Sequence, residues 1–122
     1  MSLHIRERYG LLINNEWVPA SDGAEFNVYN PANGEQLAVC AEATQADVDK
    51  AVAAATEAFK MWKTVSQVDR ADYLLKIADA IDAHKEHLAQ VETYDNGKPI
   101  RETLNVDIPL GADHFRYFAG VL

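Results

Sequence analysis

Basic residues and cysteine are scarce in this sequence, and long apolar runs are missing. Eleven Lys and Arg residues stand against 19 Asp and Glu residues, so the formal net charge is −8 at pH 7. A nucleic-acid-binding surface needs clustered Lys and Arg to neutralise phosphates, so we expect no DNA or RNA partner. The single cysteine, Cys40, cannot form an internal disulfide and suits a reducing compartment. No apolar run approaches the roughly 20 residues of a membrane span, so we expect no membrane partner and a cytoplasmic location.

The 122 residues, 48% of them hydrophobic, are enough for one small domain with its own core. No internal repeat or low-complexity tract occurs. The composition shifts once, from strand-forming residues before Ala43 to helix-forming residues after it. The sequence therefore predicts an α+β chain, with two short β-hairpins followed by three helices.

The first hairpin is predicted over Tyr9 to Val18, where Asn14-Asn15 supplies residues that accept positive φ. Because an isolated hairpin is marginally stable in water, we expect Leu12 and Trp17 to anchor it in a core. The second hairpin pairs residues 26–29 with residues 36–41 across a turn that contains Gly34.

Cys40 lies in the last of these strands among apolar neighbours. A reactive thiolate needs a nearby cation or a helix N-terminus, and the neighbouring sequence offers neither. We interpret Cys40 as a packed residue without a catalytic role.

Two amphipathic helices follow. The first is capped by Thr44, with Asp47 three residues later as in a capping box. The second begins near Ser66, with a slight break expected at His84-Lys85-Glu86-His87. His84 and His87 have a spacing that two metal ligands could use, but no further His or Cys falls at ligand spacing, so we interpret them as part of a solvated face. The predicted apolar stripes are Val48, Val52, Ala55, Phe59 and Trp62 in the first helix, and Leu74, Ile77, Ile81, Leu88 and Val91 in the second.

The chain then turns a corner at Asn96-Gly97-Lys98-Pro99. Asn and Gly tolerate the left-handed backbone at the end of a helix, and proline fixes φ for the next one. A third helix is predicted over residues 100–122, with Leu104, Ile108, Phe115, Phe118 and Leu122 along one stripe. Pro109 lies inside it and should kink or divide it.

The corner also carries a family resemblance. Residues 92–99 read Glu-Thr-Tyr-Asp-Asn-Gly-Lys-Pro, which resembles the Glu-Thr-Leu-Asp-Asn-Gly-Lys-Pro signature in the N-terminal part of the NAD(P)-dependent aldehyde dehydrogenases. Four further blocks follow the order of that family, and the resemblance extends from Gly10 to Leu122. These blocks are residues 13–18, 29–35, 46–52 and 115–120.

The resemblance implies that residues 1–122 are the N-terminal part of the family's α/β Rossmann-like coenzyme-binding domain. Residues 1–8 are expected to be disordered. The parent enzyme would oxidise an aldehyde to a carboxylic acid with NAD or NADP, and bacterial acetaldehyde-oxidising members look most similar. The family's nucleotide-binding turn, ribose-binding lysine, glutamate base and cysteine nucleophile all lie further along than Leu122.

This chain alone is therefore expected to have no catalytic or cofactor-binding residue, to be inactive, and to bind no cofactor. Its expected partners are the remainder of the aldehyde dehydrogenase chain and, as a homo-oligomer, further copies of the same protein. The alternative is a stand-alone, non-enzymatic helical module for interaction or oligomerisation.

The resemblance also implies one metal site. Asp107 matches an aspartate that binds a monovalent cation in the family, together with backbone carbonyls from the segment matching Val28 and Tyr29. The alternative is that Asp107 caps the helix segment around Pro109.

Overall fold

The computed structural model describes residues 4–121 and divides them into two compact units. One unit contains residues 5–29 and 34–64, and the other contains residues 65–121 together with residues 30–33 and His4. No helix among the described residues is both long and apolar enough to cross a membrane.

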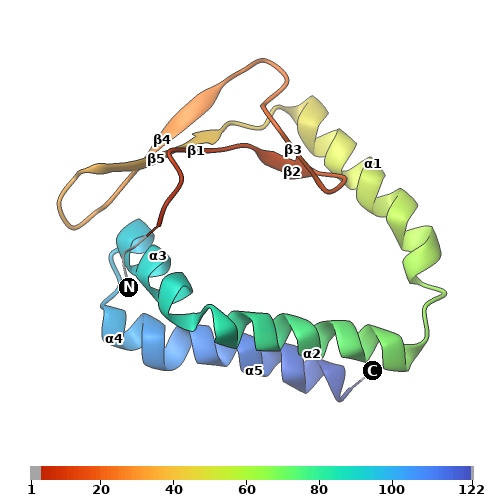
Figure 1. The fold of residues 1–122 in the computed structure, drawn as a ribbon. Helices are drawn as coiled ribbons and strands as arrows, with labels where there is room; N and C mark the ends of the chain where they lie inside the picture. The colour runs from red at the N-terminus through yellow and green to blue at the C-terminus, as the bar shows by residue number, and fades with distance from the viewer. Residues whose placement is uncertain (1–3, 122) are drawn as a thin grey trace. The chain divides into compact units, whose positions relative to one another are not determined.

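The first unit contains a three-stranded sheet in the order β1-β5-β4 (Figure 1). Strands β4 (Glu25–Tyr29) and β5 (Gln36–Ala41) pair antiparallel, which confirms the second predicted hairpin. The register shifts between Val28 and Tyr29, as in a β-bulge. Strand β1 (Arg8–Tyr9) adds to the other edge of β5 in parallel, a long-range pairing that the local sequence pattern did not predict.

The first predicted hairpin is also present, although Tyr9 belongs to β1 and not to it. Strands β2 (Leu11–Ile13) and β3 (Glu16–Val18) pair antiparallel. Asn14 and Asn15 take φ of 51° and 64°, so both adopt the left-handed backbone that a two-residue hairpin turn requires.

The prediction that Leu12 and Trp17 anchor this hairpin in a core is wrong for the described chain. The two residues pair directly across the strands, and they are 56% and 59% exposed. Side chains alternate between the faces of a hairpin, so Leu12 and Trp17 share one face. The half-buried Leu11, Ile13 and Val18 share the other.

Helix α1 (Gln45–Trp62) completes the first unit and has the predicted capping box. Thr44 accepts from the backbone N–H of Asp47, and the Asp47 carboxylate accepts from the backbone N–H of Thr44 at 3.0 Å. Asp47 also accepts from the N–H of Ser21 at 3.0 Å and from its hydroxyl at 3.1 Å. The carboxylate, only 3% exposed, thus joins the start of α1 to the loop after β3.

The second unit is helical. Helix α2 (Gln67–Ala83) is capped by Ser66 and ends at His84, and α3 (Lys85–Asn96) begins directly after it, so the expected break is present (Figure 1). A short α4 (Ile100–Glu102), a π-helix η1 (Thr103–Asp107) and α5 (Ile108–Ala119) complete the unit.

Helices α2 and α5 lie side by side (Figure 1). Ala78 of α2 and Ala112 of α5 are fully buried, and small side chains of this kind allow two helix backbones to approach closely. At the edge of the contact, the guanidinium of Arg116 lies 3.2 Å from the Asp79 carboxylate and 2.6 Å from that of Asp82. The pKa of Arg116 is raised by its hydrogen bonds to Asp82 and Asp79.

The chain accommodates Pro109 by a local widening of the helix and not by a break. Pro109 occupies the first turn of α5, where the missing N–H costs least, and the wider π-helical turn of η1 directly precedes it. The expected disruption is therefore a π-helix within an otherwise continuous helical segment.

The described chain buries few large apolar side chains. Its buried hydrophobic residues are all alanines, namely Ala20, Ala38, Ala78, Ala89 and Ala112. Members of the predicted stripes remain largely exposed, among them Val52, Phe59 and Phe118. The sequence analysis expects residues 1–8 to be disordered. Residues 1–3 lie outside the described residues, and Arg8 lies in β1.

Candidate functional site

The candidate site lies in the helical unit, at the corner between α3 and α4. Gly97 ends α3 with φ of 81°, and its N–H donates to the carbonyl of Thr93 at 3.0 Å. A Cβ atom at Gly97 would meet Cγ of Pro31 at 3.0 Å. Both the backbone conformation and this close approach therefore favour glycine, and the predicted helix-to-helix corner is confirmed.

Lys98 follows at a position that the backbone holds in place. Its N–H donates to Oδ1 of Asn96 at 2.8 Å, and Pro99 then restricts the chain at the entry to α4. From this position the Lys98 side chain reaches Asp107, nine residues further along, with Nζ 2.5 Å from Oδ2.

A buried hydroxyl joins the corner to the π-helix. Oγ1 of Thr103, whose side chain is fully buried, lies 3.1 Å from the carbonyl oxygen of Ala89 on α3. It also lies 3.0 Å from Oγ1 of Thr93 and 3.2 Å from the carbonyl oxygen of Ile100. These contacts hold η1 against α3 and so fix the backbone that carries Asp107.

Asp107 is the last residue of η1, and its side chain is 23% exposed. It stands at the N-terminal end of α5 but makes no side-chain capping hydrogen bond there. The alternative prediction that Asp107 caps the segment around Pro109 is therefore wrong. The carboxylate faces Lys98 instead.

The electrostatics of this pair favour the charged lysine. The hydrogen bond to Asp107 is the main influence that raises the pKa of Lys98, and the charges of Glu92 and Glu102 act in the same direction. Lys98 therefore remains an ammonium ion at neutral pH.

The other two predicted cation ligands, Val28 and Tyr29, lie on β4 in the strand-containing unit. A bulge leaves a residue of the ladder unpaired, and the register shift falls between these two residues. A carboxylate and backbone carbonyls are the hard oxygen ligands that alkali cations take. The residue types fit a monovalent cation, and the three-residue site stays a prediction.

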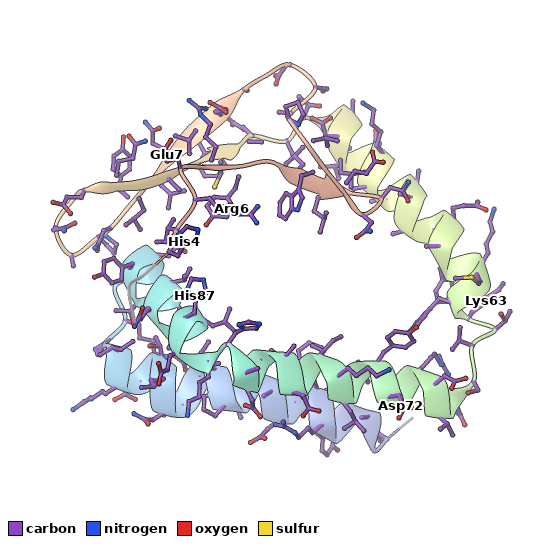
Figure 2. All side chains as sticks on the ribbon, in the orientation of Figure 1. His4, Arg6, Glu7, Lys63, Asp72 and His87 are labelled. Atoms are coloured by element: carbon purple, nitrogen blue, oxygen red, sulfur yellow. The ribbon has the colours of Figure 1, made fainter. Side chains whose placement is uncertain are left out.

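The other residues that the sequence analysis considered are His84, His87 and Cys40. His84 lies at the junction of α2 and α3, and His87 lies on α3 (Figure 2). Within residues 4–121, no three His, Cys, Asp or Glu side chains gather closely enough to hold a metal ion. Cys40 is half-buried in β5, between Tyr9 of β1 and Phe26 of β4 in the ladder.

Sequence reasoning missed Lys98 as a site residue. Lys98 and Asp107 are nine residues apart and separated by a corner, so no helical or strand periodicity relates them. The available signal was a lone lysine directly beside a glycine that reverses the chain direction.

Comparison with known proteins shows which family this chain matches. Residues 17–122 match the model of the aldehyde dehydrogenase family. A Bacillus subtilis protein whose name assigns it to the aldehyde dehydrogenases, DhaS, is 52% identical over 112 residues, which are 90% of this chain. The acetaldehyde dehydrogenase of Pseudomonas aeruginosa is 50% identical over 117 residues, or 96% of the chain.

Among solved structures, the NAD+ complex of an aldehyde dehydrogenase from Bacillus cereus superposes with a TM-score of 0.90 and 43% identity over 93% of this chain. The chain spans 24% of that structure. It likewise spans 23% of the length of each of the two curated relatives.

Proposed function

Because the chain belongs to the aldehyde dehydrogenase family, we propose that it is the N-terminal segment of a longer enzyme that oxidises an aldehyde to a carboxylic acid. The reaction consumes the aldehyde, water and NAD+ and yields the acid, NADH and a proton. The family match over residues 17–122 carries this proposal. NAD is the proposed cofactor, because the Bacillus cereus relative is a complex with NAD+.

The similarity to the Pseudomonas aeruginosa enzyme supports acetaldehyde, or another short aliphatic aldehyde, as the substrate class. The residues that would perform the chemistry lie outside the 122 residues, and Cys40 is not proposed as the nucleophile. Within the enzyme, this segment would cover other elements, and Asp107 would contribute to a monovalent cation site with the backbone of Val28 and Tyr29.

The exposed apolar surface supports a role as a covering layer. Twenty large hydrophobic side chains are exposed among residues 4–121, whereas the buried hydrophobic residues are small alanines. An exposed apolar patch larger than a few hundred Å² marks a face that another element covers, and a core made only of alanines leaves the large apolar side chains of this chain without cover. We propose that the remainder of the same polypeptide covers these faces, and that the assembled enzyme is a cytoplasmic homo-oligomer.

Enzyme assay and mass measurement test the proposal together. The full polypeptide purified from its source should be several times heavier than 13.5 kDa and should reduce NAD+ when acetaldehyde is added, whereas residues 1–122 alone should not. A full-length protein that forms no NADH with any of a series of aliphatic and aromatic aldehydes would refute the proposed activity.

A non-enzymatic interaction module is the second candidate, favoured by the same exposed apolar surface. On α5, Tyr117 and Phe118 are 68% and 56% exposed, and their rings meet edge to face with centroids 5.2 Å apart. A native protein of 13.5 kDa that self-associates through such residues would support this second candidate and exclude the first.

A further inference from the structure

Arg70 of α2 has a buried hydrogen-bond donor without an acceptor. Its Nε–H group is shielded from solvent, and no acceptor among residues 4–121 receives it. An arginine stays charged in a protein, so it cannot relieve this burial by losing a proton. A buried donor without a partner carries a large desolvation penalty, and the penalty is larger for a charged group. The described residues therefore leave the guanidinium of Arg70 without a partner that its burial requires.

Arg70 lies on the side of α2 that packs against α5. Arg70, Leu74 and Ile81 are half-buried, and they follow the helical period together with the fully buried Ala78. Helix α5 packs along α2 within the same compact unit. An acceptor for Arg70 is therefore expected from an element that continues along this side of α2.

The acidic residues next to Arg70 in the sequence do not supply the acceptor. Oδ2 of Asp69 accepts from the hydroxyl of Ser66 at 2.6 Å, as part of the cap of α2. Asp72 lies two residues from Arg70, and side chains with this spacing do not face each other on a helix. The acceptor must come from elsewhere in the polypeptide.

Helix α5 runs antiparallel to α2 and ends before it reaches the level of Arg70 (Figure 1). Arg116 contacts Asp79 on α2, and α5 ends at Ala119, three residues later. Arg70 precedes Asp79 by nine residues, which is about 14 Å along the helix axis. Three further residues of α5 cover only about 5 Å of this distance. The level of Arg70 is therefore roughly 9 Å beyond the end of α5, in the direction in which the chain runs.

A carboxylate is the acceptor that suits this position. The guanidinium group is a planar fork of donors that matches the two oxygens of a carboxylate. The same two helices already use such a contact, because the guanidinium of Arg116 on α5 lies 2.6 Å from the carboxylate of Asp82 on α2. This chain spans only 24% of the Bacillus cereus aldehyde dehydrogenase structure, so the proposed enzyme has further polypeptide to supply the group.

We infer that Arg70 binds a carboxylate of the segment that follows Leu122, and so holds the continuation of the polypeptide against α2. The acidic residue should lie within about ten residues after Leu122, because one and a half to three helical turns span the distance that remains. The inference rests on the proposed longer polypeptide. It assigns Arg70 an intramolecular partner and gives it no part in the aldehyde reaction.

A double-mutant cycle on the full polypeptide tests the inference by urea unfolding. Arg70→Met is combined with the neutral amide variant of each Asp and Glu among the first ten residues after Leu122. Arg70→Met should raise the equilibrium constant for unfolding about tenfold, because a hydrogen-bonded charge pair is lost. One acidic variant should cause a similar change, and adding Arg70→Met to it should cause little further change. Additive effects for every acidic residue would overturn the inference, as would the absence of Asp and Glu from these ten residues.

Arg101→Met is the matched control, because Arg101 lies in the same compact unit and its side chain is 82% exposed. It should leave the unfolding constant nearly unchanged and should show no coupling to the acidic residues. Arg70→Lys keeps the charge without the planar fork and should retain part of the coupling. If Arg70→Met does not fold, Arg70→Lys replaces it in the cycle.

Two further measurements separate the possible outcomes. If inorganic phosphate stabilises the wild type but not Arg70→Met, and every cycle is additive, the occupant is a free anion and the inference is overturned. Formation of NADH from acetaldehyde and NAD+ is measured on the same proteins. Normal NADH formation with additive cycles would refute only the role of Arg70, whereas a coupled pair in a protein that forms no NADH would support that role and refute only the proposed activity.

Discussion

At the scale of single residues, the buried polar side chains of Asp47 and Thr103 each join separate segments of the chain by hydrogen bonds. Asp47 satisfies four donor groups from Ser21 and Thr44, and Thr103 joins three neighbouring groups through one hydroxyl. A buried polar group without such partners carries a large desolvation penalty. Changes at Asp47 and Thr103 should therefore be more damaging than changes at the exposed apolar positions.

Asp47 predicts a dependence of stability on pH. Hydrogen bonds from the backbone of Ser21 and Thr44 lower the pKa of Asp47 from 3.8 to about 2. A carboxyl with a lower pKa in the folded state contributes stability that is fully present above its unfolded pKa. This contribution should therefore be lost as the pH falls from about 4 to about 2.

Urea unfolding of the full polypeptide across this pH range measures the effect. Asp47→Asn should be less stable than the wild type at neutral pH, and the difference should shrink toward pH 2. The control is Asp72→Asn on the exposed surface of α2, which should change little (Figure 2). A pH-independent difference between Asp47→Asn and the wild type would contradict the assigned pKa.

Thr103 predicts a hydrogen-bond effect separate from packing. Thr103→Val keeps the shape of the side chain but removes its hydroxyl, which leaves the Ala89 carbonyl without this partner. The free energy of unfolding should fall by about 1–3 kcal/mol. Thr103→Ser retains the hydroxyl and tests the methyl group alone. A valine variant as stable as the wild type in denaturant titrations would show that the network contributes nothing.

At the scale of elements, the corner between α3 and α4 requires backbone freedom that α5 does not. Gly97→Ala should destabilise the protein by about 1–2 kcal/mol, because alanine is strained at φ of 81° and its Cβ would press on Pro31. Gly111→Ala on α5 meets no atom within 4 Å and should stabilise by about 0.5–1 kcal/mol. Opposite signs in thermal melts of the two variants would confirm this assignment, and equal signs would refute it.

At the scale of the whole molecule, the exposed apolar faces predict the behaviour of residues 1–122 expressed alone. Without the covering polypeptide, the isolated chain should bind a hydrophobic dye, self-associate and unfold without a sharp transition. Sedimentation velocity and circular dichroism melts measure these properties. A monodisperse, cooperatively unfolding chain of 122 residues would instead favour the stand-alone module.

Much of the fold could be predicted from sequence because it depends on neighbours in the chain. The Asn14-Asn15 turn, the Thr44 cap and the Gly97 helix end each follow from the backbone preferences of a few adjacent residues. The parallel pairing of β1 with β5 could not be predicted in this way, because its partners are about thirty residues apart and carry no shared local signal.

The residues of the candidate site were likewise only partly predictable from the sequence. Asp107 was identified by its place in a family-like sequence, but the lysine that faces it was not, because only the corner and the π-helical turn bring the two together. Trp17 was predicted to be a core anchor from its residue type, and tertiary structure decided otherwise.

The sequence by itself determined the two hairpins, most of the helices, the Thr44 and Ser66 caps and the family, since these rest on local backbone preferences and on residue identity. Tertiary structure alone decided which apolar faces stay exposed and which charges meet, because burial and ion pairing depend on what packs against a side chain. Along α1, the helical period places Val48, Val52 and Phe59 on one stripe, yet all three remain exposed within the described chain. Periodicity identifies an apolar face of a helix, and only the surrounding structure decides whether another element covers that face.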